Sequence, residues 1–177
     1  VHGRAGICEI TLSHRRFQDW HRSRCLFFIY RADAGPPERF TISYTAPPKD
    51  TLFATENLAG LEKVSQLPGF EDAGLETAQA VLEECARFNE GVVAPLNWEG
   101  DQNPSRFEAG KVITTPGFQD AFRQYAEAGW QGLQHPAEFG GQGLPKTIGA
   151  ACTEMLNSAN MSFALCPLLT DGAIEAL

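Results

Sequence analysis

Apolar side chains recur at helical spacing through most of residues 44–177. The longest pattern spans residues 74–97, where apolar residues follow one another at steps of three or four and therefore share one stripe of a helix: Leu75, Ala78, Val81, Leu82, Cys85, Phe88 and Val92. The opposite face carries four glutamates and an arginine. Because a proline removes a helical hydrogen bond, Pro95 is expected to end or bend this helix.

Two further helices are predicted before residue 130. A short amphipathic stretch follows Pro48 and runs through Leu61, and Leu67-Pro68-Gly69 is a strong stop signal after it. Thr115-Pro116 combines a capping residue with a proline suited to the first helical position. The helix that follows places four side chains on one side, and Gly129 is a natural C-terminal stop: Phe118, Phe122, Tyr125 and Ala126.

The remaining segments give weaker patterns. Residues 98–114 are rich in turn formers and are expected to connect two helices, with Lys111 to Thr114 as a brief extended piece that has no evident partner. A helix is predicted from near Pro145 to Leu156, with a possible break at Asn157 to Asn160. Thr170-Asp171-Gly172 is expected to open a last helix. The predicted fold class is mainly α.

The last predicted helix reaches Leu177 with no capping signal, and Ile174 and Leu177 present apolar side chains there. A helix that is begun and not closed favours the interpretation that these residues are a fragment of a longer protein. No internal repeat is visible.

Charge divides the chain at about residue 43. Residues 1–43 hold seven arginines and four acidic residues, a net charge of +3, whereas residues 44–177 hold seven basic and eighteen acidic residues, a net charge of −11. Three interpretations of residues 1–43 compete: a targeting leader, an extension that folds onto the rest, and a translated upstream segment that is not part of a domain. We favour the third, and we assign no function there.

The composition excludes some classes of function. A net charge of −8 argues against a nucleic-acid-binding protein, which needs a basic face. No apolar run approaches the length of about 20 residues that a membrane span requires. Five scattered cysteines have neither metal-ligand nor disulfide-framework spacing, so we expect free, mostly buried thiols in a reducing compartment such as the cytoplasm, and no metal site.

Three groups of residues are candidates for chemical roles. The cluster Gly140-Gly141-Gln142-Gly143 is predicted to be a tight structural turn, because the strand and the glycine spacing of a phosphate loop are missing. Cys166 and His135 are a possible thiol–imidazole pair, but a buried, inert Cys166 is the preferred interpretation. For Glu154, an ion pair or an exposed face is preferred over a catalytic carboxylate.

The order of these residues resembles the acyl-CoA dehydrogenase family. The resemblance rests on Gly129-Trp130-Gln131-Gly132-Leu133 and on the segment from His135 to Gly143, with Phe118 to Phe122 upstream and Ser158 to Phe163 downstream. Tyr44-Thr45-Ala46-Pro47 resembles the N-terminal stretch of a larger subgroup that includes the 3-(methylthio)propanoyl-CoA dehydrogenases. The resemblance covers about residues 44–177 and identifies them as an incomplete N-terminal helical domain.

The resemblance implies an FAD-dependent enzyme that oxidises an acyl-CoA to a trans-2-enoyl-CoA. It also implies an electron-transferring flavoprotein as electron acceptor and a homo-oligomeric full-length protein. The flavin-contacting strand and the catalytic glutamate of the family have no counterpart in these residues, so no catalytic residue is carried over, no flavin-binding residue is assigned and the fragment alone is expected to be inactive.

The family resemblance also implies that the helix around Met161 to Leu169 lines the far end of the acyl pocket. Phe163 and Pro167 are the expected wall positions. If both only pack in the domain core, replacing Phe163 by alanine should lower stability without changing chain-length preference.

A different class of function remains open. The chain also fits a self-contained helical protein-interaction module without flavin chemistry. Solution behaviour separates the two interpretations, because an isolated N-terminal domain should expose the apolar face that its missing domains would cover and should bind hydrophobic dyes.

Overall fold

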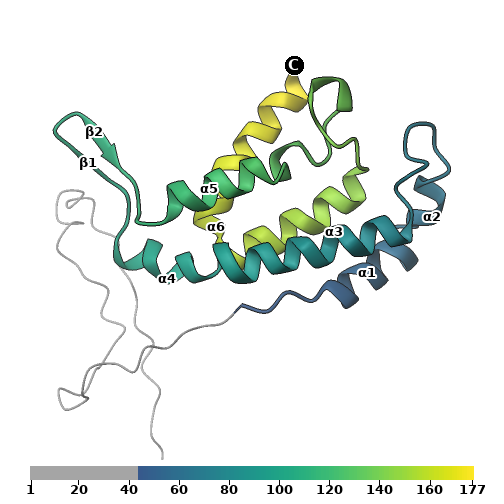
Figure 1. The fold of residues 1–177 in the computed structure, drawn as a ribbon, viewed down its shortest axis with the longest axis horizontal. Coiled ribbons are helices and arrows are strands. Elements are labelled where there is room, and N and C mark those ends of the chain that lie inside the picture. The colour runs from purple at the N-terminus through teal and green to yellow at the C-terminus, as the bar shows by residue number, and fades with distance from the viewer. Residues whose placement is uncertain (1–43) are drawn as a thin grey trace, which may run out of the picture. The chain divides into compact units, whose positions relative to one another are not determined.

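Residues 44–177 are described by a computed structural model, and most of them are helical (Figure 1). The mainly α fold class is therefore confirmed. The predictions for residues 1–43 lie outside the described residues. Within the described part, no helix combines the length and apolar character needed to cross a bilayer.

The amphipathic pattern of residues 74–97 folds as two helices joined by a wider turn. Helix α3 spans Leu75–Phe88, a π-helical turn spans Asn89–Val93, and helix α4 spans Pro95–Gln102. Asn89 is buried, and its Nδ2 donates to the Cys85 carbonyl oxygen at 2.9 Å. Pro95 occupies the start of α4, where its missing N–H costs nothing, so the expectation that the helix ends or bends at this proline is confirmed.

The stretch after Pro48 also divides. Helix α1 spans Pro48–Asn57 and α2 spans Leu61–Val64, separated by Gly60 at φ 68°. That backbone conformation strongly favours glycine and interrupts the predicted single amphipathic stretch. Helix α1 packs against α3 and α6 (Figure 1).

The extended piece predicted at Lys111 to Thr114 is confirmed, but residues 98–114 hold more regular structure than the expected connecting segment. Helix α4 continues to Gln102, and a hairpin follows in which β1 (Arg106–Glu108) pairs antiparallel with β2 (Lys111–Ile113). Phe107 faces Val112 across the pair, and both strands are exposed. Three-residue strands carry too little alternation to be seen in a sequence, so the partner of Lys111 to Thr114 was missed.

The predicted cap at Thr115-Pro116 is also wrong. Helix α5 spans Phe118–Glu127, and its N-cap is Gly117 at φ 85°. Thr115 is instead buried, with its hydroxyl donating to the Asn103 carbonyl oxygen at 2.9 Å. The C-terminal stop is confirmed, because Gly129 adopts φ 76° directly after the helix.

Helix α6 (Lys146–Ala176) consists of two arms that meet at Asn160. Asn160 has extended backbone angles, φ −163° and ψ 94°, so the predicted break is confirmed. Lys146 Nζ lies 2.5 Å from Glu175 Oε2, although a straight helix rises about 1.5 Å per residue and would hold these residues tens of ångströms apart. The arms therefore fold back on each other (Figure 1). We call residues 146–159 the first arm and residues 161–176 the second arm.

The expected restart of a helix at Thr170 is wrong, because the second arm continues through Pro167 and Thr170 without a break. Two apolar clusters place the arms. Most of the first arm packs with α3 and Leu133 in one cluster, and the second arm packs with α5, Val93 and the end of the first arm in the other. Between α5 and the first arm the chain forms the single turns η2 (Trp130–Gly132) and η3 (Ala137–Phe139).

Candidate functional site

Phe163 and Pro167 both lie buried on the second arm. The Phe163 ring meets three aromatic rings of α5. Its centroid is 5.9 Å from Phe118 and 6.0 Å from Tyr125, both in edge-on geometry, and 6.3 Å from Phe122. Such edge-on pairs stabilise beyond the burial of area alone. The two residues are four positions apart and so lie on the same side of the helix.

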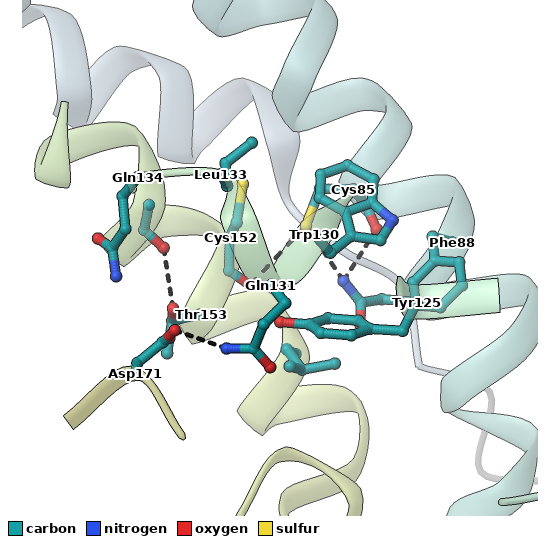
Figure 2. A pocket seen from close by; sticks show the side chains of 13 residues that line it. Cys85, Phe88, Tyr125, Trp130, Gln131, Leu133, Gln134, Cys152, Thr153 and Asp171 are labelled. Atoms are coloured by element: carbon teal, nitrogen blue, oxygen red, sulfur yellow. Dashed lines mark hydrogen bonds between the residues drawn. The ribbon is translucent and has the colours of Figure 1, made fainter. Parts of the chain in front are cut away.

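Pro167 brings a polar contact to this otherwise apolar side. Its carbonyl oxygen accepts a hydrogen bond from Gln131 Nε2 at 3.3 Å. The same nitrogen donates to Asp171 Oδ1 at 2.6 Å, one turn further along the arm (Figure 2). One side chain from η2 therefore holds two successive turns of the second arm.

A buried histidine completes this polar group. His135 Nε2 donates to Asp171 Oδ1 at 3.0 Å, and the His135 residue is only 7% exposed. We call Gln131, His135 and Asp171 the Asp171 clasp. The proposed thiol–imidazole pair does not form, because His135 is paired with Asp171. The expectation that Cys166 is buried is wrong, since its side chain points to solvent from the second arm.

The glycine-rich turn packs directly on the base of the clasp. Gly140 and Gly143 have φ of 86° and 66°, and a Cβ on Gly141 would lie 2.0 Å from the His135 carbonyl oxygen. The Gly141 N–H donates to the Pro136 carbonyl oxygen and the Gly143 N–H to that of His135. These donors are already engaged within the turn, so they are not presented to a phosphate.

A small cavity opens between α3, η2 and the two arms (Figure 2). Its volume is about 30 Å³, which admits a water molecule but is far below the 300–1,000 Å³ typical of small-molecule sites. Tyr125 and Asp171 line it together with Cys85 and Cys152. Burial raises the pKa of the Tyr125 phenol, and the Asp171 carboxylate raises it further.

Cys152 at this cavity is a poor nucleophile. A hydrogen bond with Cys85 raises the pKa of the Cys152 thiol, and burial adds to the rise. The thiol therefore stays protonated, and a protonated thiol neither attacks a substrate nor binds a metal well. Among residues 44–177, no three His, Cys, Asp or Glu side chains are grouped as a metal site would require. Glu154 is exposed on the first arm.

Sequence reasoning missed Gln131 and Asp171 as site residues. They stand 40 positions apart, and no local pattern joins them. The available signal was the polar Asp171 on an apolar helix, which was interpreted as part of a helix start.

Comparison with known proteins adds independent information. Residues 75–177 match the family model described as acyl-CoA dehydrogenase, N-terminal domain. The chain is 48% identical over 136 residues to a 3-methylmercaptopropionyl-CoA dehydrogenase of Ruegeria pomeroyi, covering 77% of this chain and 23% of that protein. It is 30% identical over 119 residues to FadE5 of Mycobacterium tuberculosis, a broad-specificity linear acyl-CoA dehydrogenase, covering 66% of this chain and 20% of that protein.

The chain thus spans less than a quarter of the length of the curated relatives that it matches. The family model nevertheless covers more than half of the chain, from the start of α3 to the end of the second arm. The chain therefore belongs to the acyl-CoA dehydrogenase family, through the N-terminal helical domain of that family.

Proposed function

We propose that residues 44–177 are the N-terminal part of an FAD-dependent enzyme that oxidises an acyl-CoA to a trans-2-enoyl-CoA. The 48% identity to a 3-methylmercaptopropionyl-CoA dehydrogenase over 77% of this chain carries the proposal. The second relative also bears the name of an acyl-CoA dehydrogenase and supports the same reaction class. The length of these relatives implies that a protein of their kind holds several times more chain than this one.

The described residues do not fit a flavin by themselves. Their cavity of about 30 Å³ is too small, and the N–H groups of the glycine-rich turn are engaged within that turn. We therefore propose that FAD and the catalytic base belong to parts of the protein beyond residues 44–177. Further elements of the proposal are an electron-transferring flavoprotein as electron acceptor, a homo-oligomeric protein and a cytoplasmic location.

The contribution proposed for the described residues is a wall of the acyl pocket. Phe163 and Pro167 share one side of the second arm, and their environment is aromatic and apolar apart from the Pro167 carbonyl. An apolar wall suits an acyl chain, because burying it removes hydrocarbon from water. Cys166 and Glu154 have no part in the proposal.

The test uses the longer protein that contains these residues, expressed and purified under conditions that retain cofactor. We expect flavin absorbance, bleaching of that absorbance by a saturated acyl-CoA and a trans-2-enoyl-CoA product by mass spectrometry. 3-Methylmercaptopropionyl-CoA and a series of straight-chain acyl-CoAs are the substrates to compare. A protein that holds no flavin and changes none of these thioesters would sink the proposal and favour a helical interaction module.

A further inference from the structure

We propose that the Asp171 clasp is a positioning device that sets acyl-chain-length preference by fixing the second arm of α6. The part concerning chain length rests on the proposed function. The part concerning the arm's position rests on the contacts of residues 130–176 alone.

The second arm is not held in place by helix continuity. At Asn160 the backbone leaves helical geometry, and the second arm starts afresh with the Asn160 side chain as its N-cap. Asn160 Oδ1 accepts from the Phe163 N–H at 3.1 Å and from the Ser162 hydroxyl at 2.7 Å. Pro167 lies inside the second arm and has no N–H to donate to the preceding turn, so the helix lacks one hydrogen bond there. The arm can therefore pivot about Asn160.

Apolar packing fixes the second arm near its start only. Its buried residues are Phe163, Ala164 and Pro167, and nothing beyond residue 167 is buried. On the far side of the arm Met161 is 62% exposed and Leu169 is 75% exposed. Past Pro167 the arm is joined to the rest of the described residues by the two bonds to Asp171 and the exposed Lys146–Glu175 pair.

The segment that carries Gln131 and His135 is packed firmly against the first arm. Leu133 is buried in the cluster around the first arm, and a Cβ on Gly149 would lie 2.6 Å from the Gln134 amide oxygen. The Gln142 N–H donates to the Gly132 carbonyl oxygen and the Gly143 N–H to that of His135, and these bonds further fix the segment. Asp171 therefore ties the second arm to a segment that is itself packed against the first arm.

Phe163 and Pro167 lie between the pivot and the clasp. A displacement of the arm at Asp171 is transmitted to both, since they share one helix with it. One methylene in a hydrophobic pocket changes enzyme discrimination by roughly 10- to 200-fold, so small shifts of a wall are measurable in kcat/KM.

The experiment compares Asp171→Ala with Glu175→Ala in the full-length protein. Asp171 and Glu175 both lie on the second arm, and each carboxylate is paired with a basic side chain outside that arm. Glu175, however, is exposed and lies outside the clasp. We expect Asp171→Ala to reduce the ratio of kcat/KM between the preferred acyl-CoA and one two methylenes longer by about tenfold. We expect Glu175→Ala to leave this ratio within about twofold of the parent, because its pair is solvated.

Two conservative variants guard against simple loss of folding. Asp171→Asn keeps an acceptor for Gln131 and should retain most of the preference. Gln131→Leu keeps volume and removes the bonds to Pro167 and Asp171 but leaves the His135–Asp171 bond, so it should reproduce part of the change seen in Asp171→Ala. A uniform fall of kcat/KM for every chain length in Asp171→Ala would indicate a structural role only and overturn the proposal. An equal shift in Glu175→Ala would also overturn it.

Amide hydrogen exchange tests the geometry without any substrate. Asp171→Ala should speed exchange in residues 161–176 and leave residues 147–156 of the first arm unchanged, whereas Glu175→Ala should change neither. Unchanged exchange in the second arm would overturn the clasp. If the full-length protein is inactive but Asp171→Ala still speeds exchange in the second arm, the proposed function and the chain-length claim are overturned. The claim that the clasp positions the arm then stands.

Discussion

The two arms of α6 have similar lengths but are stabilised in different ways. The first arm buries seven residues along its whole length, from Ile148 to Ala159, whereas the second arm buries only three after the break at Asn160. Their exposed apolar residues follow the same division, with Met161, Leu165 and Leu169 all on the second arm. A continuous apolar face therefore fixes one helix, while an aromatic contact and a few directional hydrogen bonds fix the other.

This difference determines how each arm should respond to a single change. Burying one large apolar side chain is worth about 1.5–3 kcal/mol, and the first arm buries three, Ile148, Met155 and Leu156. A hydrogen bond to a charged group is worth about 1.5–3 kcal/mol, and the second arm has two at Asp171. Damage to the first arm should therefore unfold the unit as a whole, and damage to the second arm should open that arm first.

The largest expected effect comes from Phe163→Ala. Removing a buried aromatic side chain costs about 3–5 kcal/mol, and Phe163 is the only large apolar side chain buried on the second arm. Amide hydrogen exchange in residues 161–176 should speed up at denaturant concentrations well below those that unfold the whole unit. The matched variant Met155→Ala, costing about 2–5 kcal/mol in the first arm, should raise exchange in both arms together. The same pattern of hydrogen exchange in both variants would show that the two arms are not stabilised differently.

A smaller effect is expected at the glycine-rich turn that precedes the first arm. Gly141→Ala places a methyl group against the His135 backbone oxygen and should cost about 1–3 kcal/mol through forced displacement of the turn. Gly143→Ala meets no atom within 4 Å but must adopt φ 66°, so about 1–2 kcal/mol of backbone strain is expected. Thermal denaturation ranks the two, and crystal structures should show His135 displaced in Gly141→Ala only. An undisturbed His135 there would show that the turn does not support the clasp.

Asn160→Ala tests the junction itself. The variant loses the N-cap of the second arm, worth about 0.5–2 kcal/mol, together with the contact from Nδ2 to the Val93 carbonyl oxygen at 3.4 Å. Asn160→Asp retains the capping oxygen but sets a carboxylate oxygen against the Val93 carbonyl, so it should recover only part of the loss at neutral pH. Chemical denaturation of the three proteins measures this. If alanine is as stable as the parent, the cap does not hold the arm.

The smallest effect concerns Glu175 and depends on pH. A hydrogen bond from Lys146 lowers the pKa of the Glu175 carboxyl below its ordinary value, and the charge of Lys146 adds to this. A lowered folded-state pKa gives stability that is present above the unfolded pKa and is lost as pH falls through the folded one. Glu175→Gln should therefore melt slightly below the parent at neutral pH and equal it in acid. A difference that grows in acid would contradict the assignment.

The sequence predicted the elements whose information is local. The stripe from Leu75 to Val92 identified α3, Gly129 marked the end of α5, and the polar run ending at Asn160 marked the junction of the arms. The mainly helical class follows from the same spacing. The family followed from the residues between Gly129 and Gly143, whose unusual order leaves few alternatives.

Other features depend on contacts that are distant in the sequence. Thr115 has the chemistry of a cap, yet its hydroxyl bonds Asn103 and the helix starts after Gly117. Cys166 lies in an apolar run and was expected to be buried, but its side of the second arm faces solvent. The bond between His135 and Asp171 spans 36 positions and is formed only because α6 folds back. Pairing of this kind is decided by tertiary packing and leaves no periodic trace.

The fold-back at Asn160 also has a consequence for the order of folding. Residues 130–135 contact both arms, but they precede both in the chain, so the first arm finds them across a shorter loop than the second arm does. Shorter loops close at lower entropic cost, and local contacts form earlier. We expect the first arm to be in place when the second arm docks, and docking of the second arm to be the last step of folding and the first to reverse.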